Sequence, residues 1–135
     1  MEAQGRREFS GHADQVAAAR GFVASAIQGS DPARDVSRLL VSEAATNALL
    51  HSGSGDGGTF SVEYLISGDR LRVEVHDGGS AFGPRRRVHH LESMTGRGLD
   101  LFDALSDRWG VDGGPEGWTV WFELHLAAEQ ARSGG

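Results

Sequence analysis

The stretch "LLVSEAATNALLHSG", Leu39–Gly53, decides the fold because it combines a helical apolar rhythm with an unusual polar side. Glu43, Asn47 and His51 recur at every fourth position, so on a helix they form one stripe. The apolar side of this helix is expected to consist of Leu39, Leu40, Ala44, Ala48 and Leu49. The stretch contains no Lys or Arg, whereas a solvent-facing stripe usually carries opposite charges at helical spacing.

This polar stripe has two interpretations. Glu43 offers a carboxylate that suits a general base, and Asn47 offers a neutral oxygen to a hard cation such as Mg²⁺. Because Mg²⁺ keeps several waters and takes other ligands from substrate phosphates, one asparagine suffices on the protein side. The alternative is a helix face turned to water, which is common in globular proteins.

The composition excludes several classes of protein. The 135 residues are expected to form a single domain, 1–135, with its core at about 6–126 and a disordered tail at 127–135. All 13 basic residues are arginine, so a Walker-type phosphate loop and a lysine Schiff-base enzyme are both excluded. Cysteine is absent, which removes disulfides and thiolate metal sites.

Charge and hydropathy indicate where the chain works. The formal net charge of −6 disfavours direct binding to nucleic acid. No apolar run approaches the length of about 20 residues that crosses a bilayer, and the first 15 residues have no apolar centre of a signal peptide. We therefore expect a cytoplasmic protein that contacts no membrane.

Periodicity predicts an α+β two-layer sandwich, in which a mostly antiparallel sheet is covered on one face by about three helices. The expected strands are 6–10, 59–67 and 70–77, joined by a tight turn at 68–69, and two more within 107–111 and 116–124. The expected helices are 14–27, 32–50 with a cap from Asp31, and one that begins at about Gly96. A loop of about 18 residues, 78–95, separates the second hairpin strand from the third helix, a length that is usually functional.

Two further polar points lie at element boundaries. Asp77, in "VHDGG", ends a strand. Its carboxylate can accept a hydrogen bond from an amino group, and the glycines that follow let a flat ring approach the backbone. The alternative is that these residues form an ordinary turn. Gly96 and Gly98, in "TGRGL", expose amide N–H groups at a helix start, which suits phosphate oxygens; a flexible loop is the alternative.

The order of these points resembles the GHKL superfamily of ATPases, which have the Bergerat fold. Glu43 and Asn47 match the family's N box, "DGG" with Asp77 and Gly79 matches its G1 box, and "GRGL" matches its G2 box. Thr119 stands where the family has a late-strand threonine beside its adenine-binding aspartate. The resemblance covers about residues 6–126 and is strongest to the small bacterial anti-sigma factor serine/threonine kinases of the RsbW/SpoIIAB type.

The resemblance implies a role for each matching residue. Glu43 would be the catalytic base, and Asn47 would hold Mg²⁺ and contact the nucleotide. Asp77 would bind the adenine amino group of ATP or ADP, with Thr119 supporting it directly or through water and Gly79 admitting the base. The remaining nucleotide contacts would come from the G2 box, namely Gly96, Arg97, Gly98 and Leu99.

The resemblance also implies partners. The expected function is that of an anti-sigma factor that binds a sigma factor of RNA polymerase and phosphorylates a STAS-type anti-anti-sigma protein, and small members of this group commonly form homodimers. A regulatory module that binds nucleotide and sequesters a partner without phosphoryl transfer is the alternative, and a plain ATP hydrolase is a third.

A zinc site formed by His89 and His90 with His76 or His51 is not expected, because no acidic or thiol pattern accompanies them.

Overall fold

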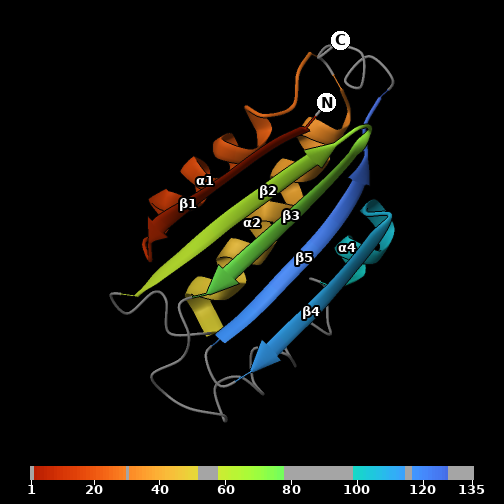
Figure 1. Ribbon diagram of the computed structural model, residues 1–135. Coiled ribbons are helices and arrows are strands. Elements are labelled where there is room, and N and C mark those ends of the chain that lie inside the picture. Colours follow the sequence, from red (N-terminus) through yellow and green to blue (C-terminus); the bar gives the residue numbers. More distant parts are fainter. Residues whose placement is uncertain (1, 30, 52–57, 78–98, 115–116, 128–135) are drawn as a thin grey trace.

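The computed structural model describes residues 2–29, 31–51, 58–77, 99–114 and 117–127, with the backbone alone at 49–51, 99 and 114. The elements in this part of the chain are β1 (Glu2–Ser10), α1 (Asp14–Ala24), α2 (Ala33–His51), β2 (Thr59–Ser67), β3 (Arg70–Asp77), α4 (Leu99–Leu105), β4 (Arg108–Gly114) and β5 (Gly117–His125). The strands form one sheet, and the helices lie on one of its faces (Figure 1). The predicted α+β two-layer sandwich is confirmed.

The strand order places two distant segments side by side. The sheet runs β1-β2-β3-β5-β4, and every neighbouring pair is antiparallel. The hairpin of β2 and β3 turns at Gly68, whose φ of 63° lies in the left-handed region that glycine tolerates. Because β5 pairs with β3, the end of β3 lies beside the start of β5, with His76 opposite Thr119.

A buried carboxylate fixes the start of α2. Asp31 accepts a hydrogen bond at 2.9 Å from the backbone N–H of Ala33, as the predicted helix cap requires. Its second oxygen accepts a hydrogen bond at 2.8 Å from the N–H of Ala127, just after β5. Asp31 therefore ties the start of the longest described helix to the end of β5.

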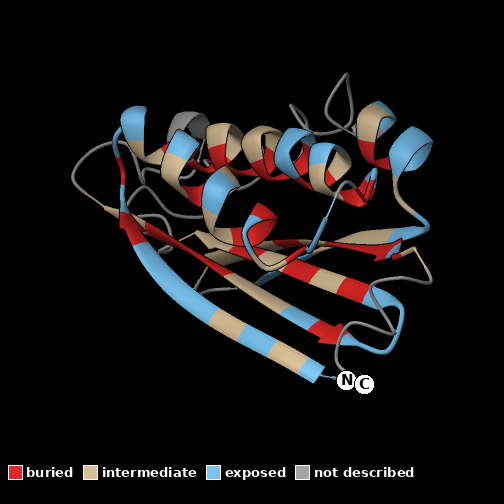
Figure 2. Cartoon of the chain, turned by 90° about the horizontal axis from the view of Figure 1, so that it is seen from above, coloured by how far each residue is buried: buried red, intermediate tan, exposed pale blue. Residues whose placement is uncertain are grey.

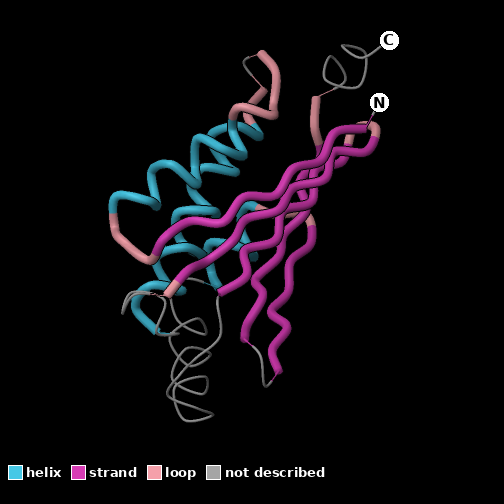
Figure 3. Tube along the Cα trace, turned by 60° about the vertical axis from the view of Figure 1, so that its left-hand side comes forward, coloured by secondary structure: helices cyan, strands magenta, loops and turns pink. Residues whose placement is uncertain are grey.

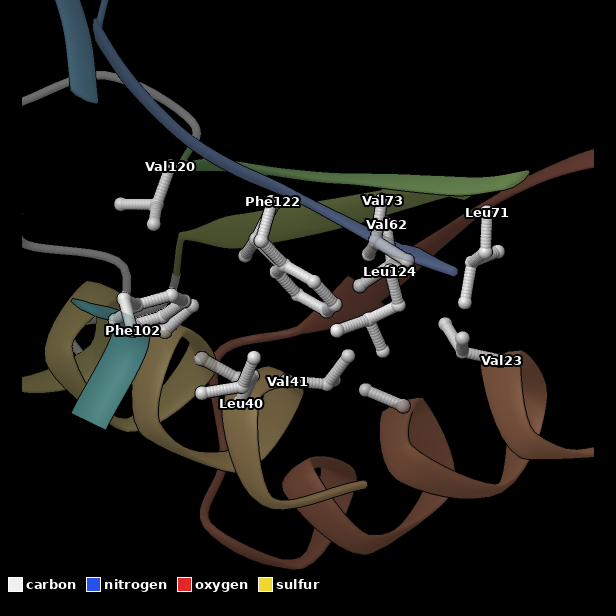
Figure 4. Close-up of a cluster of buried hydrophobic side chains, with 14 of the residues drawn as sticks. Val23, Leu40, Val41, Val62, Leu71, Val73, Phe102, Val120, Phe122 and Leu124 are labelled. Carbon is white, nitrogen blue, oxygen red and sulfur yellow. The ribbon is translucent and has the colours of Figure 1, made fainter. Parts of the chain in front are cut away.

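The core fills the space between the two layers. Figure 2 shows the buried residues gathered where the helices face the sheet, and Figure 4 shows strand side chains meeting helix side chains there. The labelled members that are almost fully buried are Val23, Leu40, Val41, Val62, Leu71, Val73, Phe102, Val120, Phe122 and Leu124. Tilted ring pairs, such as Phe102 with Phe122 at 5.9 Å, add to the packing.

Three details differ from the sequence predictions. β1 begins at Glu2 rather than at residue 6, because it pairs with β2 along its whole length, from Glu2 opposite Ser67 onward. α1 ends at Ala24 rather than at residue 27, and tighter backbone bonds continue the turn. Leu39 was expected on the apolar side of α2, yet 46% of it is exposed, whereas Val41 is buried.

The second face of the sheet carries no helix among the described residues, as Figure 3 shows, and we refer to it as the open face. This face carries Glu123, a nearly buried carboxylate that lies 3.1 Å from Arg70 and 3.0 Å from Arg72. Burial acts to raise the pKa of Glu123, but the hydrogen bonds from Arg72 and Arg70 hold it below its ordinary value.

None of the described helices has the length and apolar character needed to span a bilayer.

Candidate functional site

The polar stripe of α2 lies between core and solvent. Glu43 and Asn47 are both half-buried, while Ala44, Ala45 and Ala48 of the same helix are in the core. The side-chain Nδ2 of Asn47 donates a hydrogen bond at 2.9 Å to the backbone carbonyl of Glu43. This bond uses a side-chain N–H of Asn47 and holds the side chain against the helix. The side-chain oxygen Oδ1 of Asn47 is therefore the group suited to a hard cation.

Asp77 lies on the helix-covered face of the sheet. It follows Val73 and Val75, which alternate into the core, and it is paired directly opposite the buried Phe60 of β2. Residues opposite each other in an antiparallel pair point to the same face. Oδ1 of Asp77 accepts a hydrogen bond at 3.2 Å from the backbone N–H of Trp118, which fixes the carboxylate between two strand ends.

The two polar points meet at one end of the sandwich. Figure 1 shows the C-terminal end of α2, the end of β3 and the start of β5 at the same end of the molecule, and α2 packs against both strands. The half-buried stripe of Glu43 and Asn47 thus belongs to the helix that covers the strand ending in Asp77. A general base, an oxygen ligand and a hydrogen-bonding carboxylate are therefore carried by elements that pack together.

Thr119 lies on the opposite face. Its Oγ1 is 2.8 Å from Nδ1 of His76, and both residues belong to the open face. Successive residues of a strand point to opposite faces, so Thr119 and its neighbour Trp118 are separated by the sheet. The resemblance implies that Thr119 supports Asp77 directly or through water, and the described structure shows no direct contact between the two residues.

Trp118 is the residue that sequence reasoning missed at this position. Its backbone binds Asp77, and its side chain lies over Gly113 of β4, where an added Cβ would be 2.2 Å from the indole. The signal was present in the sequence, because Trp118 continues the inward alternation of Val120 and Phe122. The inward position beside the aspartate is thus occupied by a tryptophan, with the threonine one residue further on.

The remaining candidates fall largely outside the described residues. This holds for Gly79 of the G1 box and for Gly96, Arg97 and Gly98 of the G2 box. Leu99 begins α4, where its backbone alone is described, and the side chain of His51 at the end of α2 is likewise outside the description.

The comparison with protein families decides the assignment. Residues 9–124 match the histidine kinase-like ATPase domain, a span that contains α1, α2, α4, the strands β2 to β4 and all of β5 but its last residue. The chain belongs to the histidine kinase-like ATPase family. The resemblance to the GHKL superfamily is thereby confirmed, and the α2 stripe and Asp77 both lie inside the matched segment.

Relatives within this ATPase family are similar across most of the chain. The serine-protein kinase RsbW of Listeria monocytogenes serotype 4a is 36% identical over 115 residues, which cover 76% of this chain and 66% of that protein. The serine-protein kinase RsbW of Bacillus mycoides is 30% identical over 110 residues, covering 73% of this chain and 68% of that protein. The chain thus spans about two thirds of the length of these relatives, and the RsbW-type resemblance is supported.

Proposed function

We propose that this member of the histidine kinase-like ATPase family is an anti-sigma factor that uses ATP to phosphorylate serine or threonine in a partner protein. One observation carries the proposal: Glu43 and Asn47 lie half-buried, one turn apart, on the helix that packs against the strand ending in Asp77. The similarity to proteins named serine-protein kinase RsbW supports the same conclusion.

In this proposal Asp77 recognises the adenine of ATP or ADP. A carboxylate has roughly four acceptor positions, so the bond that Asp77 accepts from Trp118 is compatible with a further bond from the adenine amino group. That bond also fixes the direction of the carboxylate before the nucleotide arrives. Gly79 would admit the ring, and Gly96, Arg97, Gly98 and Leu99 would contribute the other nucleotide contacts.

Asn47 is the proposed Mg²⁺ ligand. Its amide nitrogen is engaged with the carbonyl of Glu43, which fits a role in which the amide oxygen faces the cation. Mg²⁺, when bound, would neutralise charge on the transferring phosphoryl group. Metal binding would explain why the polar stripe of α2 has a carboxamide at Asn47.

Glu43 is the proposed general base. Its carboxylate would accept the proton of a serine or threonine hydroxyl as that oxygen bonds to the terminal phosphorus of ATP. The bond from this phosphorus to the bridging oxygen breaks at the same time, and ADP leaves with the bonding electrons. Because Glu43 is half-buried rather than fully exposed, bulk water has only partial access to its carboxylate.

The proposed partners follow from the same resemblance. The phosphate acceptor would be a STAS-domain anti-anti-sigma protein, and the sequestered partner a sigma factor of RNA polymerase. We also propose that the chain forms a homodimer, as small members of this group do.

A panel of STAS-domain proteins and sigma factors tests this function. The purified chain with Mg²⁺ and γ-labelled ATP should label a serine or threonine in one STAS protein, and it should retain one sigma factor on an affinity column. If the chain binds ATP and a partner but labels no STAS protein, it is the alternative, a nucleotide-binding regulatory module. If it binds neither nucleotide nor sigma factor, the proposal is wrong as a whole.

A further inference from the structure

Three potential ligand groups for a metal ion converge on the open face, on the opposite side of the sheet from the carboxylate of Asp77. They are Glu63 of β2 and Glu74 and His76 of β3, and one ligand atom from each lies within 4.8 Å of the other two. Nε2 of His76 is 3.2 Å from Oε1 of Glu74 and 3.6 Å from Oε1 of Glu63. All three residues are partly buried.

The pairing of the two carboxylates requires a compensating positive charge. Glu63 and Glu74 are directly opposite each other across β2 and β3, an arrangement in which like charges destabilise a sheet. Arg72 binds one oxygen of Glu74, Oε2, at 2.9 Å, which leaves Oε1 directed at His76. Glu63 is paired opposite Arg6 of β1, but no ion pair joins these two residues in the part of the chain that the structure describes.

The imidazole is held in the orientation typical of a metal ligand. Nδ1 of His76 is 2.8 Å from Oγ1 of Thr119, and an Nδ1–H that donates to this oxygen leaves the lone pair of Nε2 toward the carboxylates. Nε2 is inaccessible to solvent and has no hydrogen-bond partner among the described residues. An Nε2 lone pair beside two carboxylates becomes favourable when a cation, either a proton on Nε2 or a bound metal ion, lies between them.

The spacing matches a divalent transition metal. In a tetrahedral zinc site with bonds of about 2.0–2.1 Å, ligand atoms are roughly 3.4 Å apart. The two distances from Nε2, 3.2 and 3.6 Å, lie on either side of this value. Imidazole with carboxylates suits Zn²⁺ or Co²⁺ better than Mg²⁺, which prefers oxygen ligands alone.

We propose that Glu63, Glu74 and His76 bind one divalent transition-metal ion of the Zn²⁺ class, with water in the remaining position. Thr119 positions the imidazole, and Arg72 orients the carboxylate of Glu74, so both act through a ligand. Such an ion links β2 to β3 next to Asp77, and it stabilises the folded chain by binding to it. This site does not depend on the proposed kinase activity.

Isothermal titration of the metal-free chain with ZnCl₂, together with Co²⁺ absorption spectra, tests the site. The wild-type chain should bind one ion, and His76→Gln and Glu63→Gln should each weaken binding more than about 100-fold, because each removes one of three ligands. Thr119→Val should weaken it by about 10-fold, the effect typical of a group that orients a ligand. His125→Gln is the matched control: this histidine faces a single carboxylate, Asp69, at 3.5 Å, and its loss should leave the affinity unchanged.

Thermal unfolding gives a second readout. A hundredfold excess of Zn²⁺ over its Kd should raise the Tm of the wild-type chain by roughly 5–10 °C and leave Glu63→Gln unmoved. Glu63 is substantially exposed, so this variant is expected to fold even if His76→Gln does not. The proposal is overturned if the wild-type chain takes up no Zn²⁺, or if folded Glu63→Gln binds it with unchanged affinity.

Discussion

Oδ1 of Asp77 accepts a hydrogen bond at 3.2 Å from the backbone N–H of Trp118, across the junction of β3 and β5. This bond joins two segments that are 41 residues apart in the chain and fixes the carboxylate on the helix-covered face. The proposed adenine contact depends on this arrangement, because a carboxylate that is already oriented loses little freedom when the base binds.

Asp77→Asn should weaken ATP binding by roughly 10- to 100-fold. The change replaces a charged acceptor that contributes about 1.5–3 kcal/mol, and the amide presents an N–H in place of one acceptor oxygen. Calorimetric titration with ATP measures the effect. Asp69→Asn, in the turn at the other end of β3, is the matched control and should bind ATP as the wild type does. Equal affinity in the wild type and Asp77→Asn would remove the adenine assignment.

Thr119→Val should leave ATP affinity within about twofold of the wild type, because its hydroxyl binds His76 on the open face. The family resemblance implies instead that Thr119 supports the adenine contact directly or through water, so that its loss would weaken ATP binding. The same calorimetric titration separates the two. A tenfold loss in Thr119→Val would show that the hydroxyl reaches the nucleotide through water or through a rearranged strand.

Gly110→Ala should lower the free energy of unfolding by about 1–3 kcal/mol, the usual cost of overpacking. A Cβ at Gly110 would lie 2.6 Å from the indole of Trp121, whose ring centroid is 4.2 Å from the guanidinium of Arg72. Urea denaturation measures the change.

Gly21→Ala is the opposite case to Gly110→Ala. No atom lies within 4 Å of the added Cβ in α1, so the higher helix propensity of alanine should stabilise by about 0.5–1 kcal/mol. If Gly110→Ala raises the urea midpoint as Gly21→Ala does, the packing of Trp121 over β4 is not as described.

Glu123→Gln should destabilise the chain in a pH-dependent way. The folded pKa of Glu123 lies below its ordinary value of 4.5, so its ion pairs stabilise the fold above that pH and this contribution is lost as the pH falls through the folded pKa. At neutral pH we expect a loss of about 1–2 kcal/mol, since the partner arginines are partly exposed. Urea unfolding at a series of pH values checks this. The difference in the free energy of unfolding between Glu123→Gln and the wild type should shrink below pH 4.5. Glu8→Gln, on an exposed position of β1, should show no such trend.

The fold was predictable where the sequence pattern and the packing agree. The alternation of the hairpin strands predicted β2 and β3 with their observed bounds, because each strand has one core face and one wet face. The start of β1 was not predictable, since residues 2–5 (EAQG) have low strand propensity and become a strand only by pairing with β2. Leu39 shows the same limit: helical periodicity gives a broad apolar stripe, but only the packed neighbours decide which edge is exposed.

The candidate site was predictable in part. The four-residue spacing of Glu43 and Asn47 placed them on one helix face without any tertiary information. The roles of Trp118 and Thr119 depend on which face of β5 each occupies, and this follows from the register with β3, a pairing between distant segments. The cluster of Glu63, Glu74 and His76 was not predictable for the same reason, because only the register of β2 with β3 brings Glu63 to the other two.

Phosphoryl transfer by Glu43→Gln tests the central claim most directly. With Mg²⁺, γ-labelled ATP and a STAS-domain acceptor, the wild-type chain should label a serine or threonine. Glu43→Gln should lose at least 100-fold in rate while it binds ATP with unchanged affinity, because it lacks only the proton acceptor. Glu8→Gln should transfer at the wild-type rate. Transfer by Glu43→Gln at the wild-type rate would contradict the account, since the carboxylate on α2 would then have no part in the chemistry.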